Sequence, residues 1–577
     1  MLKVHFTAGD GKGWALDEDL RQIKASLGSA VQISGPAKAD IIHAAYWGNL
    51  LQVAPSILRE RYVIAHADNP PFYSLKQVEF GLGCQWVDLW VARSREAHSQ
   101  FSKLGLPVVH IPYSIDPELF FPIPNKAELR QKYGLPADAY IIANFHRDAE
   151  GSDLHTPKFQ KAPELFVIIL KALIEKGLPV HALIAGPRRH WMRNQLKLNG
   201  IPFSFIGKDT GERDDFGANI LDRPTLNELT NAADLYLIPS RWEGGPQSVM
   251  EAAACKIPVL STPLGVGLDI LEPKSLFRSA TEAVDCIASD IHDRTLRDTI
   301  EPQFARWEAN HTTARMADGL RALYEELPEK MRARPGPTRS HPIKAQTQSL
   351  AFRLLNRWDP PAPARSVRII HQKGVIDSMD QLIKRLSDLL LEMGLNPDSD
   401  HPDLILIGNP PESSQPFLPG APAIQWITPE LPASRILPGA LIVAPSVQDV
   451  LELRNRGLPN PSVVLPLVES SPAFVENPDP IRIETSDTNA SLRVWDALAR
   501  GIPVAYPSDS AYGEQVFLGG LPYSTATGVD NIMGQLRSEA STFQRLIRIP
   551  NKEETSAMLY RLLRLPSLAR TPSLVFS

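Results

Sequence analysis

The chain has 577 residues, of which 43% are hydrophobic and 22% are charged, and its formal net charge is -5. A single core rarely exceeds a few hundred residues, so this length predicts several domains. The slightly acidic balance argues against a nucleic-acid-binding protein, which would normally carry a basic surface.

Only three cysteines occur, Cys84, Cys255 and Cys286, and they are widely separated. This spacing favours neither a disulfide framework nor a zinc site. The N-terminus enters a strand at once, without the charged and apolar regions of a signal peptide. The longest apolar runs, such as residues 165–170, fall far short of the ~20 residues that span a bilayer. We therefore expect a cytoplasmic protein, with peripheral membrane contact left open.

Strand-like and helix-like segments alternate from residue 1 to about residue 325, which is the pattern of parallel α/β domains. The first unit, residues 1–130, is predicted to hold buried strands at 2–9, 39–47, 62–68 and 87–94 and a helix at 16–28. The second unit, residues 131–328, is predicted to hold strands at 139–148, 180–187, 203–209, 234–240 and 257–263 and helices at 247–256 and 312–327.

The most informative segment of the second unit is 238–263, IPSRWEGGPQSVMEAAACKIPVLSTP. It places Glu243 and Glu251 on either side of a glycine-proline turn that leads from a strand into a helix. A helix N-terminus after a parallel strand binds anions, because free N–H groups and the helix dipole face the ligand. The two carboxylates suit hydroxyl groups, such as those of a sugar and a ribose beside a diphosphate.

Basic residues follow an earlier strand of the same unit: Arg147, then Lys158 and Lys161. Without a metal ion, fixed cations are needed where negative charge develops on a leaving diphosphate. A solvated basic loop is the alternative interpretation of this cluster.

The Glu-x7-Glu spacing, with PS before it, EGGP inside it and EAAACKIPV after it, resembles the signature of retaining glycosyltransferases of family 4 (group 1) with the GT-B fold. That resemblance implies two Rossmann-like domains facing a cleft and final helices that cross back onto the first domain. It implies that Glu243 contacts the donor sugar and Glu251 the ribose. Further donor contacts are implied for Gly244, Gly245, Pro246, Gln247 and Ser248.

In the same family an arginine and a lysine clamp the diphosphate, which implies these roles for Arg147 and Lys161. Lys161 lies 14 residues beyond Arg147, a longer gap than is usual, so Lys158 stays a rival. The family's histidine near the reaction centre corresponds to His66, although a histidine at a strand end is more often structural. Asp68 and Asn69 follow it and are candidates for acceptor contact.

A glycine loop with Gly11 and Gly13 lies between the first strand and the first helix. Such a loop allows close approach to a phosphate or a sugar, and a plain turn is about as good an interpretation. The family has a donor-facing glycine loop at this point.

Residues 329–366 are rich in proline and arginine, a linker composition. The sequence of residues 367–577 then resembles that of the earlier units, and in this comparison Ser446 aligns with Ser94, Asp496 with Glu251 and Thr488 with Glu243. We interpret them as a shortened, degenerate and non-catalytic GT-B-like copy that serves acceptor recognition or homodimerisation. Two Rossmann-like segments that look alike by common pattern are the alternative.

The sequence thus predicts catalytic roles for Glu243, His66, Arg147 and Lys161, and no cofactor or metal, because no D-x-D or His/Cys ligand spacing follows a strand. The expected reaction moves a sugar from a nucleotide-diphosphate sugar to a glycan, lipid-linked or protein acceptor, with retention of configuration. The alternatives are a non-catalytic glycan- or partner-binding scaffold and a nucleotide-sugar epimerase.

Overall fold

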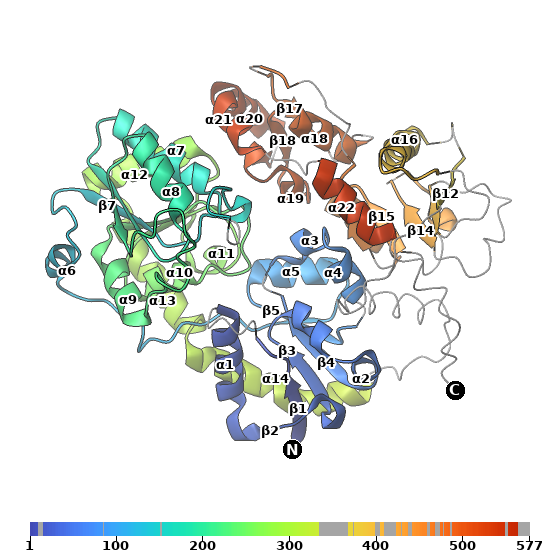
Figure 1. Cartoon of the computed structure of the whole chain (residues 1–577), viewed down its shortest axis with the longest axis horizontal. Helices are drawn as coiled ribbons and strands as arrows, with labels where there is room; N and C mark the ends of the chain where they lie inside the picture. The colour runs from blue at the N-terminus through green and yellow to red at the C-terminus, as the bar shows by residue number, and fades with distance from the viewer. Residues whose placement is uncertain are drawn as a thin grey trace.

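In the computed structural model, the described part of the first two units is 1–9, 15–67, 69–84, 86–149 and 153–333. In the C-terminal part it is 367–372, 374, 376–397, 404–408, 423–428, 430–436, 441–458, 462–467, 474–476, 478–484, 487, 489–524, 526–547 and 552–563. These residues form an α/β protein with four sheets, and the strand pairs in each are parallel (Figure 1). The α/β prediction is confirmed.

The first domain is built on a six-stranded sheet in the order β2-β1-β3-β4-β5-β6. Its strands are β1 (Leu2–Phe6), β2 (Val31–Ile33), β3 (Ile41–Ala44), β4 (Tyr62–His66), β5 (Leu89–Ala92) and β6 (Val108–His110). Every residue of β3, β4 and β5 is buried, as expected for parallel strands covered on both faces. Its helices are α1 (Ala15–Leu27), α2 (Pro55–Glu60), α3 (Pro71–Ser74), α4 (Val78–Gly83) and α5 (Arg95–Lys103).

The second domain carries a five-stranded sheet in the order β11-β10-β7-β8-β9. Its strands are β7 (Tyr140–Asn144), β8 (Val180–Ala185), β9 (Phe203–Ile206), β10 (Leu235–Ile238) and β11 (Val259–Ser261). Its helices are α6 (Lys126–Lys132), α7 (Pro163–Glu175), α8 (His190–Leu198), α9 (Arg223–Ala232), α10 (Gln247–Ala254), α11 (Gly267–Ile270), α12 (Ala280–Asp293) and α13 (Ile300–Asn310).

Helix α14 (Thr313–Ala333) leaves the second domain and packs on the first, beside α1 (Figure 1). Its apolar face, which includes Met316, Leu320 and Leu327, joins Val4 and Ile23 in one buried cluster. The two domains are therefore connected twice, and α14 covers one face of the first sheet.

The C-terminal part contains two separate sheets, one of five strands in the order β12-β13-β14-β15-β16 and one of three in the order β17-β18-β19. The strands are β12 (Val367–Ile370), β13 (Leu404–Ile407), β14 (Ala423–Trp426), β15 (Leu441–Ala444), β16 (Ser462–Val464), β17 (Ile481–Arg482), β18 (Val504–Pro507) and β19 (Gly520–Tyr523). The helices are α16 (Asp377–Glu392), α17 (Val447–Asn455), α18 (Ala490–Ala499), α19 (Gly513–Val516), α20 (Ala526–Ser538), α21 (Ala540–Leu546) and α22 (Lys552–Leu563). We call 367–467 the first lobe of this part and 474–547 its second lobe.

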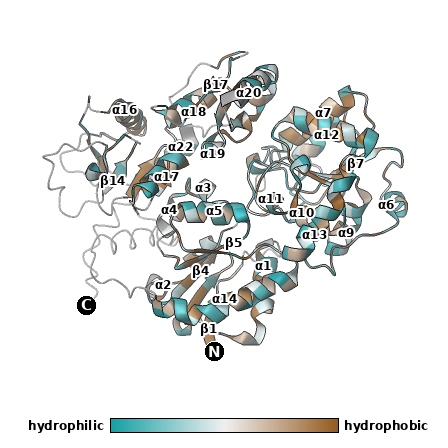
Figure 2. Cartoon of the chain, turned by 180° about the vertical axis from the view of Figure 1, so that it is seen from behind, coloured by the Kyte–Doolittle hydropathy of each residue, from teal (hydrophilic) through white to brown (hydrophobic). Residues whose placement is uncertain are grey.

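The first lobe packs on the first domain, and the second lobe contacts both domains. Phe80 and Phe101 of the first domain share one buried cluster with Val463 and Leu465 of the first lobe, and the Val464 amide donates to the Leu75 carbonyl at 2.9 Å. The cluster of the second domain includes Leu518 of the second lobe. Figure 2 shows brown, hydrophobic residues along β4 and β14 and more teal on the helices around them. Burial of apolar surface therefore holds the lobes to the domains.

Candidate active site

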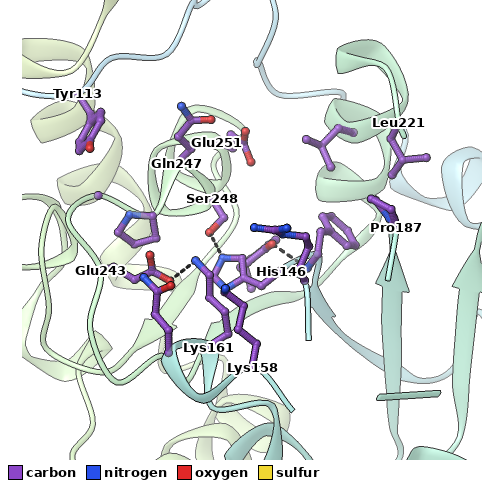
Figure 3. A pocket seen from close by; sticks show the side chains of 18 of the residues that line it. Tyr113, His146, Lys158, Lys161, Pro187, Leu221, Glu243, Gln247, Ser248 and Glu251 are labelled. Atoms are coloured by element: carbon purple, nitrogen blue, oxygen red, sulfur yellow. Dashed lines mark hydrogen bonds and ion pairs between the residues drawn. The ribbon is translucent and has the colours of Figure 1, made fainter. Parts of the chain in front are cut away.

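A cavity of about 570 Å³ lies between the first two domains. It opens at the carboxyl ends of β7, β8 and β10, the position where ligands bind in parallel α/β sheets. Figure 3 shows the side chains of His146, Lys161 and Glu243 close together in this cavity. From the first domain it is lined by Leu16, Asp19, Asn69 and Tyr113; from the second by Phe145, His146, Arg147, Lys158, Gln160, Lys161, Gly186, Pro187, Ile220, Leu221, Arg223, Leu226, Tyr236, Glu243, Gly245, Pro246, Gln247, Ser248 and Glu251. Most of the candidate residues are thus together on one wall.

The turn between β10 and α10 is shaped by close packing. A Cβ atom on Gly245 would lie 2.1 Å from the Tyr113 ring, so only glycine fits there. Pro246 precedes the first turn of α10 and no side chain caps it. The first N–H groups of α10 therefore remain available to an anion in the cavity.

Glu243 is held from two sides. Its Oε1 atom forms an ion pair with Lys161 Nζ and accepts a hydrogen bond from Ser240 Oγ at 3.0 Å. The side chain of Glu243 is buried, whereas that of Lys161 is 20% exposed at the cavity. The structure thus joins the two loops that the sequence placed in separate segments, and it fixes one carboxylate oxygen of Glu243.

Glu251 projects from α10 and meets Arg223 at the start of α9, with 3.2 Å between Arg223 Nη1 and Glu251 Oε1. Burial raises the pKa of Glu251 to about 7, and the Arg223 guanidinium acts in the opposite direction. Arg223 was not anticipated from the sequence, since it lies 28 residues before Glu251 in an ordinary helix start.

His146 is a second residue that sequence reasoning missed, although it is the neighbour of Arg147. Its Nε2 atom lies 2.7 Å from Ser248 Oγ. Burial, with the nearby cations Lys161 and Arg189, lowers the pKa of His146 well below its usual range. His146 is therefore neutral at pH 7, and the hydroxyl of Ser248 is tied to the loop after β7.

The loop that carries Arg147 is anchored by a buried ion pair. Arg189, fully buried after β8, lies 3.5 Å from Asp148 and donates to Asn144 Oδ1 at 3.2 Å. The Lys158 amide donates to the Asp148 carbonyl at 2.6 Å. These contacts keep Arg147 and Lys158 at the cavity, so both cations, with Lys161, face the same space.

His66 does not line this cavity. It ends β4 with 1% exposure, and its Nε2 atom lies 2.9 Å from His43 Nε2. Asp19 stands between His66 and the cavity, 3.8 Å from the Nδ1 atom. Burial lowers the pKa of His66 well below its usual range, so the ring is neutral.

The other candidates are distributed as follows. Asn69 lines the cavity, and its Oδ1 atom accepts from Gln160 Nε2 at 3.4 Å. Gly244 lies in the turn but is not on the cavity wall. Gly11, Gly13, Asp68 and Thr488 lie outside the described residues.

Within the described residues, no group of three or more histidine, cysteine, aspartate or glutamate side chains is placed to hold a metal ion. None of the helices that the structure describes has the length and apolar character to cross a membrane.

Residues 153–292 match the family model described as glycosyl transferases group 1. The match covers Lys158, Lys161, Glu243 and Glu251, and Arg147 precedes it. The chain is 24% identical, over 253 residues, to a UDP-Gal:α-D-GlcNAc-diphosphoundecaprenol α-1,3-galactosyltransferase of Escherichia coli, covering 41% of this chain and 60% of that protein. It is 25% identical, over 241 residues, to the lipopolysaccharide core biosynthesis mannosyltransferase LpsB of Rhizobium meliloti, and the match covers 39% of this chain and 62% of that protein.

The chain therefore spans about three-fifths of the length of these curated relatives. Among solved structures, Anabaena HepE in complex with UDP-glucose aligns with a TM-score of 0.46 and 16% identity, covering 56% of this chain and all of that one. Sucrose-phosphate synthase of Thermosynechococcus elongatus aligns with a TM-score of 0.44 and 16% identity, and the alignment covers 57% of this chain and all of that one. The second domain is thus similar to group 1 glycosyl transferases over the residues that carry Lys158, Lys161, Glu243 and Glu251.

Proposed function

We propose that this protein is a retaining glycosyltransferase that moves a hexose from a nucleotide-diphosphate sugar to a glycan, lipid-linked or protein acceptor. The observation that carries the proposal is the composition of the cavity wall. Three cations, Arg147, Lys158 and Lys161, share one cavity with the uncapped start of α10 and with two carboxylates. The cations suit a diphosphate and the carboxylates suit hydroxyl groups.

In the proposed complex, Glu251 accepts hydrogen bonds from the ribose hydroxyls and Glu243 contacts the donor sugar. The C–O bond between the anomeric carbon and the diphosphate breaks, and the acceptor oxygen bonds to the same face of that carbon. The acceptor proton passes to the leaving phosphate oxygen. Arg147 and Lys161 stabilise the charge on that diphosphate, so the reaction requires no metal ion.

Retention is proposed on the resemblance of the Glu243–Glu251 segment to retaining enzymes. His66 is assigned an indirect role in this proposal, because Asp19 and not His66 meets the cavity. We assign Asp19 and Asn69 to the acceptor side, since both come from the first domain.

The proposal is tested by thermal unfolding in the presence of UDP, GDP, dTDP, CMP or ADP and their common sugar conjugates. A ligand at ~100 times its dissociation constant stabilises the folded state by about 2.7 kcal/mol. We expect a shift with one nucleotide class that is lost in Glu251→Ala and in Arg147→Ala. Glu308→Ala, on the exposed side of α13, is the matched control and should keep the shift.

The same panel separates the alternatives. A scaffold with a dead donor site would show no shift with any nucleotide. An epimerase would show a shift but would interconvert the sugar nucleotide without an acceptor, which chromatography of the reaction detects.

We also propose that residues 367–577 are a degenerate, non-catalytic copy of the GT-B fold. Two features support this. Ser94 and Ser446 each follow a four-residue buried strand and each cap a nine-residue helix. Asp496, the counterpart of Glu251, is paired with Arg385 at 2.8 Å. A structure of the nucleotide complex tests the assignment, because nucleotide beside Asp496 would contradict it.

A further inference from the structure

A second cavity, of about 180 Å³, lies on the other side of the Glu243 turn. We call it the seam cavity, because it forms where both domains meet the second lobe of the C-terminal part. Its walls are Pro70 and Glu96 of the first domain; Ser240, Arg241, Trp242, Glu243, Thr262, Pro263, Leu264, Phe277 and Arg278 of the second; and Tyr506, Gly513, Glu514, Phe517, Leu518, Gly520 and Pro522 of the lobe. Glu243 thus borders both cavities.

The seam is closed by specific contacts. Trp242, which precedes Glu243, stacks on Tyr73 of the first domain with 3.9 Å between ring centroids, and its ring lies 5.1 Å from that of Phe517. Lys76 Nζ donates to the Glu514 carbonyl at 2.8 Å. The cavity therefore has a built aromatic wall contributed by all three parts of the chain.

Polar side chains reach this cavity from several sides. Among the described residues, the Glu514 carboxylate, the Tyr506 hydroxyl and the Arg278 guanidinium form no side-chain hydrogen bond or ion pair with one another or with other groups. Glu96 has two fixed bonds, since its Oε2 atom accepts from the Gly265 amide at 2.6 Å and its Oε1 atom accepts from Gln100 Nε2 at 3.4 Å. The walls thus offer a carboxylate acceptor, a hydroxyl and a fork of N–H donors.

The charge pattern selects the kind of ligand. Burial raises the pKa of Glu96 to about 8 and also raises the pKa of Glu514, although Lys76 beside Glu514 acts in the opposite direction. With Arg278 in the same wall, these carboxyl groups act as hydrogen-bonding groups, and the cavity lacks the cluster of negative charge that a metal ion requires. Aromatic walls with a few unsatisfied donors and acceptors suit a neutral ring that carries hydroxyl groups. A neutral sugar has that chemistry.

We propose that the seam cavity binds a neutral sugar unit of the acceptor, held by Glu514 and Tyr506 against Trp242 and Phe517. A volume of about 180 Å³ corresponds to roughly six water molecules, which limits the ligand to one ring. A further cavity of about 450 Å³ shares Glu96, Gly513 and Glu514 with it and continues along α5, so additional units extend outward there. The acceptor role rests on the proposed function, because Glu243 connects this site to the donor cavity.

Saturation-transfer NMR on the full chain tests the site with methyl α-D-glucopyranoside, methyl α-D-mannopyranoside and methyl α-D-galactopyranoside. The measurement is made with and without a saturating concentration of the nucleotide found by thermal unfolding, which fills the donor cavity. We expect at least one sugar to give a signal that persists with nucleotide. In Glu514→Gln with Tyr506→Phe its dissociation constant should rise about tenfold or more, since the Tyr506 hydroxyl is lost and an NH2 group replaces one carboxyl oxygen of Glu514.

Glu476→Gln, an exposed carboxylate in the same lobe, is the control and should bind like the unmodified protein. Nucleotide-induced stabilisation of the double variant should also be unchanged, which shows that it is folded and that the donor cavity is intact. No signal for any sugar, a signal abolished by nucleotide, or a signal unchanged in the double variant would each overturn the proposal. Absence of nucleotide binding would instead refute the donor site. Sugar binding by the unmodified protein and by the double variant, compared without nucleotide, would still show whether the seam cavity binds a sugar.

Discussion

The ion pair between Lys161 and Glu243 leads to a quantitative prediction for Lys161→Met. Removing one partner of a buried ion pair typically costs 3–5 kcal/mol, because the other charge is left uncompensated. Here Glu243 keeps the Ser240 hydroxyl, and the Lys161 side chain is 20% exposed at the cavity, so we expect about 2–3 kcal/mol. Glu243→Gln should cost less, because water in the cavity can solvate the remaining ammonium group.

Hydrogen exchange measured by mass spectrometry on peptides spanning 238–256 reports the local opening of this turn. A loss of about 2–3 kcal/mol corresponds to exchange about 30- to 150-fold faster in Lys161→Met. The loss of stability in the double variant, Lys161→Met with Glu243→Gln, should be well below the sum of the losses in the two single variants, since the same contact is lost in each. Additivity within about 0.5 kcal/mol would show that the two side chains are not energetically coupled and would refute the reasoning.

Two further predictions concern the same turn. Burial raises the pKa of Glu251 to about 7, so its carboxyl group ionises near that pH and then accepts hydrogen bonds from the ribose hydroxyls. Nucleotide affinity should therefore rise with pH up to about 7 and level off above it. Nucleotide-induced stabilisation measured between about pH 5.5 and 8.5 checks this, and the same dependence on pH in Glu251→Gln would contradict it. Phe517→Ala should lower the stability by about 1–3 kcal/mol, less than the loss for a fully buried phenylalanine, and should speed hydrogen exchange in the turn that carries Trp242. Equal hydrogen exchange in the variant and in the unmodified protein would show that the second lobe does not stabilise this turn.

Much of the second domain follows from local sequence. The run Leu235–Ile238 is apolar throughout and bounded by a polar turn, and it forms a fully buried parallel strand. Pro239 follows the last residue of β10, and the glycine-proline turn at 244–246 comes directly before α10, so the relation between Glu243 and Glu251 was readable from spacing. The strand β2 (Val31–Ile33) was missed, because three residues at a sheet edge carry little periodic signal.

What could not be predicted depends on contacts between segments far apart in the chain. Arg223 pairs with Glu251 because α9 and α10 pack together, and nothing in the local pattern of α9 indicates it. His66 was placed at the strand end correctly, but the direction of its ring depends on His43 and Asp19. The seam cavity requires three parts of the chain at once, so no local motif could reveal it.

The contacts of the C-terminal part also bear on motion between the first two domains. One lobe shares a core with the first domain through Phe80, and the other is tied to the second domain, where Arg241 Nη2 donates to the Leu546 carbonyl at 3.0 Å. Widening the cleft between the domains therefore changes the distance between the two lobes or breaks contacts at Phe517, which lies against Trp242. Because Glu243 follows Trp242 directly, the geometry of the donor cavity and that of the seam are coupled through a single turn. Deleting the C-terminal part would expose the shared core around Phe80, so point substitutions in the seam are the sounder way to separate its role from folding.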